Sequence, residues 1–171
     1  MPHATSVLAA TDRRGRPVVD TVILDYAQRS AQKIAVAGVK GVCIEIDLAE
    51  PMRLRTDDLL VLDDGTLVEV VAAPEPLIEA RVADVGALAR LAWHLGDRHI
   101  PVQVLPNRIR ARRDATLEGL LASLGAKVAL IEAPFEPEGG AYASAHGHAH
   151  HDHDHAHGRH SHSHGHHHHD H

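Results

Sequence analysis

Histidine is concentrated at the C-terminal end of this chain. Fifteen of its eighteen histidines lie between His146 and His171, where they alternate with Gly, Ala, Ser and Asp. Neutral imidazole is the commonest protein ligand for Zn, Cu and Ni, so a tract of this density predicts metal binding. Its apolar content is too low to offset the entropy cost of folding, and we expect a disordered His-rich metal-binding tail over residues 142–171. The predicted ligands are the tail histidines nearest in sequence to the folded part: His146, His148, His150, His151, His153, His155 and His157.

The composition of the remainder excludes several classes of protein. A net charge of −6 and very few aromatic residues disfavour binding to a phosphate backbone or stacking on bases, so we expect no nucleic-acid partner. No apolar stretch approaches the roughly 20 residues that span a bilayer, and the N-terminus lacks a signal-peptide pattern. We therefore expect a cytoplasmic protein without membrane contact. The lone Cys43 lies in an alternating run that predicts a strand, where we interpret it as a structural thiol.

Residues 1–76 are predicted to form a small all-β domain that has a possible role in partner docking. Residues 1–17 are expected to be irregular, whereas the following residues alternate or are rich in β-branched side chains. Asp64–Gly65 between two apolar runs indicates a hairpin. The predicted strands cover residues 18–24, 33–37, 42–48, 59–62 and 67–72.

Residues 77–141 show a different pattern, which follows a predicted stiff linker at Pro74–Glu75–Pro76. Apolar residues recur at helical spacing after Asp84, a predicted N-cap, and again after Asp114. Gly96 and Gly125 are the predicted helix stops. With strands over residues 77–82, 100–104, 108–112 and 127–132, the order is β-α-β-β-α-β, so we predict a ferredoxin-like domain and an α+β fold for the chain.

Two histidines of this second domain flank the end of its first predicted helix. His94 and His99 are five residues apart across a predicted turn, which differs from the His-x₃-His spacing that places two ligands on one helix face. His94 lies in the last helical turn, where its ring can bind free carbonyl groups, and we favour this structural role over metal ligation. His99 follows the predicted stop and is better placed for exposure to a partner.

The stretch His94–Leu95–Gly96–Asp97–Arg98–His99–Ile100–Pro101–Val102–Gln103 resembles the signature of the UreE-type urease accessory proteins, which are nickel metallochaperones. The runs at residues 59–65 and 72–77 and the His-rich tail extend the resemblance over roughly residues 18–171. Asp97 stands where this family often has Asn. Residues 110–114 lack the additional histidines that some members carry before the second helix.

The resemblance implies a function, a set of partners and a role for one residue. It implies a homodimer formed through the ferredoxin-like metal-binding and dimerisation domain, and delivery of Ni(II) to the urease apoprotein with other urease accessory proteins, including the GTPase. It also implies that His99 is the conserved nickel ligand at the dimer two-fold axis and that His94 is not a ligand.

We hypothesise that two copies of His99 meet across the axis and that tail histidines complete the coordination of the ion. Zn(II) or Cu(II) can bind the same ligands, so these donors do not provide selectivity.

Two other functions would also involve bound metal. The first is a nickel or zinc storage or buffering protein, whose metal stoichiometry would be the same as that of a metallochaperone. The second is a metal-dependent enzyme, which needs about three fixed ligands and a carboxylate, whereas His94 and His99 are the candidates in the second domain. The chain also has no Ser-His-Asp pattern, GxxxxGK[ST] loop or GxGxxG motif, so we expect it not to be an enzyme.

Overall fold

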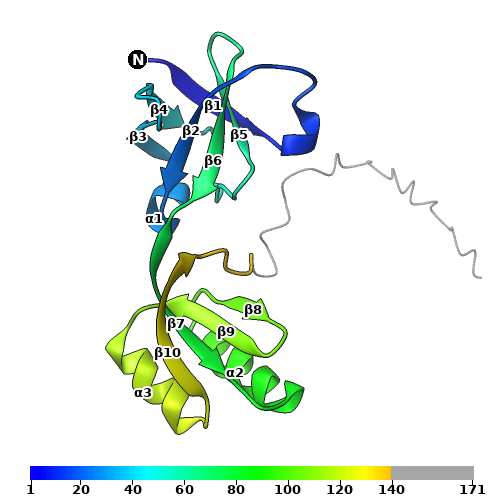
Figure 1. Cartoon of the computed structure of the whole chain (residues 1–171), viewed down its shortest axis with the longest axis vertical. Helices are drawn as coiled ribbons and strands as arrows, with labels where there is room; N and C mark the ends of the chain where they lie inside the picture. Colours follow the sequence, from blue (N-terminus) through cyan, green and yellow to red (C-terminus); the bar gives the residue numbers. More distant parts are fainter. Residues whose placement is uncertain (140–171) are drawn as a thin grey trace, which may run out of the picture. The chain divides into compact units, whose positions relative to one another are not determined.

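The computed structural model describes residues 1–139 of the chain, so the tail histidines lie outside the described residues (Figure 1). Met1–Glu138 form one compact unit. This unit contains a six-stranded sheet in its first half and a four-stranded sheet with two helices in its second half. The predicted α+β fold class, with an all-β region before a ferredoxin-like region, is confirmed. No described helix has the length and apolar character that crossing a membrane requires.

The first sheet has the strand order β2-β6-β5-β1-β4-β3. Alternate side chains of its strands enter a core that includes Val22, Ile44, Leu60 and Val70, as expected of strands with one buried face. A 3₁₀ helix (Ala10–Asp12) and the four-residue helix α1 (Tyr26–Arg29) lie in its connections. The strands are β1 (His3–Leu8), β2 (Val18–Leu24), β3 (Lys33–Ala37), β4 (Cys43–Asp47), β5 (Leu59–Leu62) and β6 (Leu67–Ala72).

The prediction that residues 1–17 are irregular was wrong. Strand β1 lies inside the sheet, parallel to β4 and antiparallel to β5. Its side chains are mostly polar or small, and Ala4 is the residue of this strand that is fully buried. A strand with so little apolar alternation is held in the sheet chiefly by its main-chain hydrogen bonds. Such bonds do not depend on side-chain type, so the sequence shows no clear strand pattern here.

The hairpin predicted at Asp64–Gly65 is confirmed. Strands β5 and β6 are antiparallel, and the Leu62 amide donates to the Thr66 carbonyl over 3.0 Å. Gly65 has a φ of +83°, which an L side chain rarely adopts, and the Asp64 carboxylate accepts from the Thr66 amide over 2.9 Å. The carboxylates of this turn therefore have structural partners, in agreement with the turn role that their positions indicate.

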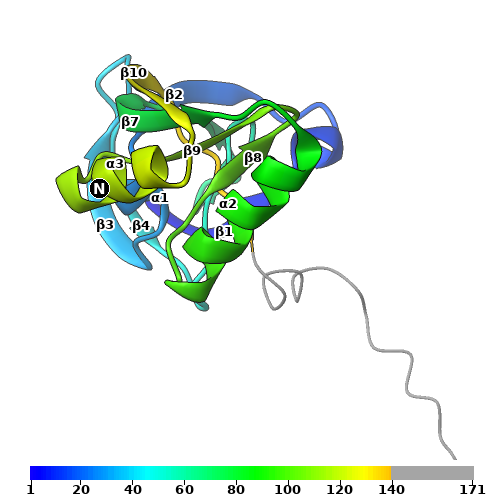
Figure 2. The same ribbon diagram turned by 90° about the horizontal axis from the view of Figure 1, so that it is seen from below.

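The second sheet has the order β10-β7-β9-β8, and every neighbouring pair is antiparallel. Helices α2 (Val85–Asp97) and α3 (Ala115–Ser123) cover one face of this sheet (Figures 1 and 2). Leu91, Leu95, Ile109 and Leu121 are in the core between them. This is the predicted ferredoxin-like arrangement. The strands are β7 (Pro74–Arg81), β8 (Gln103–Leu105), β9 (Arg108–Arg112) and β10 (Lys127–Pro134).

The stretch predicted as a stiff linker is part of this sheet. Pro74 and Pro76 pair with Pro134 and Glu132 of β10, whereas the pairing of β7 with β9 starts only at Leu77. The two prolines thus lie where β7 has a ladder partner on one side alone, which is where strands tolerate a missing N–H donor.

The segment after β10 returns to the first half of the chain, where it contacts the buried side chain of Arg29. The Arg29 guanidinium donates to the carbonyls of Leu24, Leu54 and Phe135, and its Nη1 lies 3.2 Å from a carboxylate oxygen of Glu136. Each nitrogen of this buried guanidinium thus faces at least one oxygen, as burial of a charge requires. Residues from three distant parts of the sequence are joined in this way.

Candidate metal site

Helix α2 positions the two histidines predicted from the sequence motif. Asp84 caps its N-terminus, because its carboxylate accepts from the Ala87 amide over 2.8 Å. Leu88, Leu91 and Leu95 recur at helical spacing and are buried against the sheet. This buried face fixes the rotation of the helix and thus the directions in which its last turn presents side chains.

The end of α2 differs from the prediction. Gly96 was expected to stop the helix, but it lies inside the last turn, and the helix continues to Asp97 with Arg98 as its C-cap. The Ile100 amide donates to the Leu95 carbonyl over 3.1 Å, and the His99 amide to the Gly96 carbonyl over 2.9 Å. This pair of hydrogen bonds is the Schellman motif, in which the residue after the C-cap adopts a left-handed conformation.

His99 is the left-handed residue of this motif. Its φ is +55°, and its side chain is exposed. Left-handed backbone costs an L residue roughly 1–2 kcal/mol, although histidine is among the types that adopt it more often than most. Residues held in such a conformation are concentrated at functional positions. The structure therefore presents His99 on a fixed turn with its imidazole open to a further ligand or partner.

His94 has a different environment from His99. It is half-buried, and its ring packs edge-on against Trp93 with ring centroids 5.0 Å apart. The predicted bond from its ring to a free carbonyl does not occur in the described part of the chain. Arg98 fills that role, since its Nη1 donates to the carbonyl of His94 over 2.9 Å. The packing of His94 agrees with a structural role, but the predicted capping interaction was wrong.

The remaining candidates do not assemble with His99. Within residues 1–139, no three His, Cys, Asp or Glu side chains are grouped as a metal site would require. His3 lies on β1 of the first sheet, 3.6 Å from Glu45, and Cys43 is exposed on β4. The predicted tail ligands from His146 to His157 lie outside the described residues. In the described part of one chain, His99 is thus a single donor.

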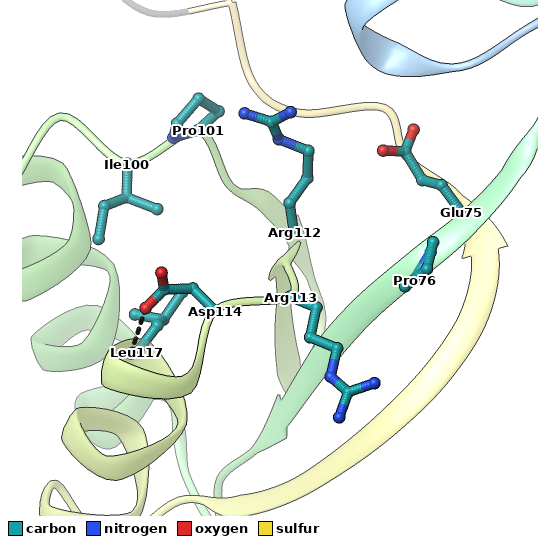
Figure 3. Close-up of a pocket in the computed structure, with 8 residues that line it drawn as sticks. All are labelled: Glu75, Pro76, Ile100, Pro101, Arg112, Arg113, Asp114 and Leu117. Atoms are coloured by element: carbon teal, nitrogen blue, oxygen red, sulfur yellow. Dashed lines mark hydrogen bonds between the residues drawn. The ribbon is translucent and has the colours of Figure 1, made fainter.

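A pocket of about 650 Å³ lies next to the His99 turn and is lined by Ile100 and Pro101 of that turn (Figure 3). Its polar groups have other partners. Asp114 accepts from the Leu117 amide as the cap of α3, and the Arg112 guanidinium lies 5.0 Å from the centre of the Tyr26 ring. The Glu75 carboxylate accepts from the Tyr26 amide over 3.0 Å. The acidic groups of this pocket are thus engaged elsewhere, and residues 110–114 contain no histidine.

Sequence reasoning missed one group of charged residues. Arg81, Arg108 and Arg110 surround Glu79 on the sheet face opposite the helices. The signal was present in the alternation of Arg108–Ile109–Arg110–Ala111–Arg112, which places every second side chain on one face of a strand.

These features define a two-domain protein, in which an all-β domain precedes a ferredoxin-like domain and a histidine-rich C-terminal sequence. Comparison with known families is consistent with this architecture. The N-terminal domain of the UreE urease accessory protein matches residues 4–73, and the C-terminal domain of the same family matches residues 75–171.

Individual relatives agree with the family match. The chain is 53% identical over 130 residues to the urease accessory protein UreE of Rhodopseudomonas palustris HaA2, covering 76% of this chain and 60% of the relative. It is 50% identical over 143 residues to that of Bradyrhizobium sp. BTAi1, covering 84% and 69%, and 44% identical over 145 residues to that of Beijerinckia indica, covering 85% and 83%. The chain belongs to the UreE family of urease accessory proteins, and it spans less than two thirds of the length of the first of these relatives.

Proposed function

We propose that this protein is a nickel metallochaperone, which binds Ni(II) and delivers it to the urease apoprotein. The observation that carries the proposal is His99, an exposed imidazole in a left-handed conformation at the end of α2, in a chain of the UreE family. Its partners are the urease apoprotein and the other urease accessory proteins, including the GTPase. Like the family's other members, the chain is an accessory factor and not the catalyst.

A single imidazole cannot hold the ion, so the site needs further donors. We propose that the protein forms a homodimer through its ferredoxin-like domain, with His99 near the two-fold axis. An isologous interface places the same residue of each protomer opposite its copy, so one histidine per chain supplies two ligands. This assembly accounts for the lack of a three-ligand cluster within residues 1–139 of one chain.

The tail histidines supply the other donors in this proposal. Covalent attachment gives them an effective concentration in about the millimolar range near the folded domain. Because many tail histidines are chemically equivalent, ligands exchange one at a time, which suits a carrier that must release its ion. Zn(II) and Cu(II) compete for these imidazoles, so correct delivery depends on partner recognition and on the metal supply.

The test is a calorimetric titration of Ni(II) into the full chain and three variants. Truncation after Ala145 should remove most of the bound equivalents, while His99→Ala should remove the tightest one. His94→Ala is the matched control, because it deletes a neighbouring imidazole of the same helix end, and it should leave the tightest class unchanged. An unaltered tightest class in His99→Ala would refute the assignment of His99.

Delivery is tested with apo-urease at limiting Ni(II). The full chain should accelerate the recovery of urease activity, and His99→Ala should lose at least half of that acceleration. If the chain protects against excess metal but has no effect on urease activation, it is a storage protein and not a metallochaperone.

A further inference from the structure

A group of cations lies on the face of the second sheet that the helices leave uncovered. Arg81 of β7 pairs with Arg108 of β9 and with Lys127 of β10, and Glu79 pairs with Arg110. Residues that are directly opposite one another on neighbouring strands point to the same side of a sheet. We call Arg81, Arg108, Arg110 and Lys127 the cationic face.

The residues of the cationic face lie on one face of the second sheet because the alternate residues of the same strands are buried in the core on its other face. Ile78, Ala80, Ile109 and Ala111 alternate with them along β7 and β9, and all four are buried in the cluster that contains α2 and α3. Because successive side chains of a strand point to opposite sides, the arginines are directed away from the helices.

Glu79 holds three of the four cations in place. One of its carboxylate oxygens lies 2.8 Å from Arg81 Nη2 and 3.8 Å from Arg108 Nη1, and the other accepts from Arg110 Nε over 2.9 Å. Its side chain is only 4% exposed. Burial raises the pKa of Glu79, but the hydrogen bonds from Arg81 and Arg110 and the positive charges of Arg81 and Arg108 together lower it by more. The net direction of the pKa is downward, so Glu79 stays ionised at neutral pH.

The charges on this face do not cancel. Glu79 neutralises one of the four positive charges, and within the described residues no other carboxylate lies within salt-bridge distance of the cationic face. Arg108 Nε is buried and has no hydrogen-bond partner among these residues. A surplus of about three positive charges thus remains on one sheet face of a chain whose net charge is −6.

Two features distinguish this face from a set of independent surface cations. The side chains of Arg108 and Arg110 are 31% and 21% exposed, so both are largely packed against the sheet, and the hydrogen bond to Glu79 positions the Arg110 guanidinium before any ligand arrives. A pocket of about 320 Å³ adjoins the face and is lined by Arg81, Lys127 and the Asn107 and Gly125 turns. Fixed guanidinium groups bind planar carboxylates in pairs of hydrogen bonds, and ordering them in advance lowers the cost of binding.

We propose that the cationic face is a docking surface for a carboxylate-rich surface of a protein partner. The surplus charge selects an anionic partner by complementarity, which also speeds association. The face carries no aromatic side chain on which a nucleotide base could stack, so a protein is favoured over a nucleic acid. The face belongs to β7, β9 and β10, whereas His99 lies between α2 and β8, and the proposal does not depend on metal binding.

The test measures binding of the full-length chain to fluorescent poly-L-glutamate by anisotropy, at low ionic strength with EDTA and at about pH 8, where imidazoles are neutral. The test variant is Arg81→Gln/Arg108→Gln, which leaves the Glu79–Arg110 pair intact. The matched control is Arg55→Gln/Arg90→Gln, which removes the same charge from two exposed arginines outside the face. We expect binding at least about tenfold weaker in the test variant and less than about twofold weaker in the control.

Three outcomes would overturn the proposal. Equal weakening in the two double variants would mean that binding follows net charge alone. Tighter binding of poly-L-glutamate by about tenfold after truncation at Ala145 would mean that the chain's own C-terminal residues cover the face. Stronger competition by an oligothymidylate of equal charge, with the same dependence on Arg81 and Arg108, would identify a phosphate ligand. Urea unfolding of each variant shows whether a loss of binding reflects a loss of folding.

Discussion

The two helices of the ferredoxin-like domain end in the same way but with different residues. At the end of α3, the Ala126 amide donates to the Leu121 carbonyl and the Gly125 amide to the Ala122 carbonyl, as the Ile100 and His99 amides do at the end of α2. The left-handed residue is Gly125 in α3, with φ +82°, and His99 in α2, with φ +55°. The backbone geometry of the two helix ends is thus equivalent.

This difference separates a scaffold position from the position of the proposed nickel ligand. Glycine has no Cβ to strain a left-handed backbone, and it is the usual residue of the motif. The end of α3 follows this rule, while the end of α2 retains a histidine that costs stability. The strain at His99 is explained if the imidazole is needed where it stands, as the proposed nickel site requires.

The largest expected effect comes from exchanging the two residues. In His99→Gly/Gly125→His, an imidazole is still present at a left-handed helix end, but at the end of α3. Calorimetry with Ni(II) should show the affinity of the tightest class reduced by at least about a hundredfold, since even changes around a ligand cost 10–100-fold. The single variant Gly125→His should retain that class. If the exchanged protein retains it as well, the position of His99 is not essential.

The second largest effect is the loss of stability when the glycine at the end of α3 is replaced by a residue with a side chain. Gly125→His should lower the free energy of unfolding by about 1–2 kcal/mol, measured by urea denaturation with EDTA. A Cβ at Gly125 would meet nothing within 4 Å, so the cost comes from the backbone conformation alone. Gly119→Ala inside α3 is the matched control, because its Cβ also meets nothing, and it should stabilise the protein by about 0.5–1 kcal/mol. Destabilisation by both variants would contradict the backbone explanation.

A smaller change in the free energy of unfolding, of opposite sign, is expected for a substitution at the end of α2. His99→Gly should raise the free energy of unfolding by about 0.5–1 kcal/mol, because relief of the left-handed strain exceeds the entropy cost of glycine. His99→Ala keeps the Cβ and should give no gain. An equal gain from alanine would show that the imidazole, and not the backbone, is the source of the instability.

The smallest effect is predicted for the other histidine of α2. His94→Gln should change the free energy of unfolding by no more than about 0.5 kcal/mol, because the ring is half-buried and meets the Trp93 ring in a T-shaped geometry. The affinity of the His94→Gln protein for Ni(II), measured by calorimetry, should change less than about twofold. A loss as large as that of His99→Ala would mean that both histidines ligate the ion.

Much of the fold was predictable because its signals are local. Asp84 and Asp114 both cap helices as predicted, since a cap needs only a side chain and an amide three residues later. The stop at Gly96 was wrong for a tertiary reason. Leu95 and Ile100 both pack in the core of the second domain, and their burial there fixes where α2 ends. A glycine inside a helix lowers the stability by only about 1 kcal/mol, so Gly96 alone does not end the helix.

The candidate site was predictable in part. The motif around His99 indicated the residue, but its left-handed conformation follows from the packing of Leu95 and was not visible in the sequence. The cationic face was missed because its members come from β7, β9 and β10, and only strand register brings them to one carboxylate. Strand β1 was missed for a related reason, since its pairing partners are remote in sequence.

The buried Arg29 has a consequence for how this protein can evolve. The two family domains meet at residues 73–75, yet this guanidinium takes oxygens from Phe135 and Glu136 as well as from Leu24 and Leu54. Separating the two domains would remove the oxygens of Phe135 and Glu136, which are half of the residues that accept from Arg29. The buried guanidinium would then lack partners for part of its charge. The two halves are therefore coupled through this cation, and an exchange of one half requires a C-terminal segment that supplies the same two oxygens.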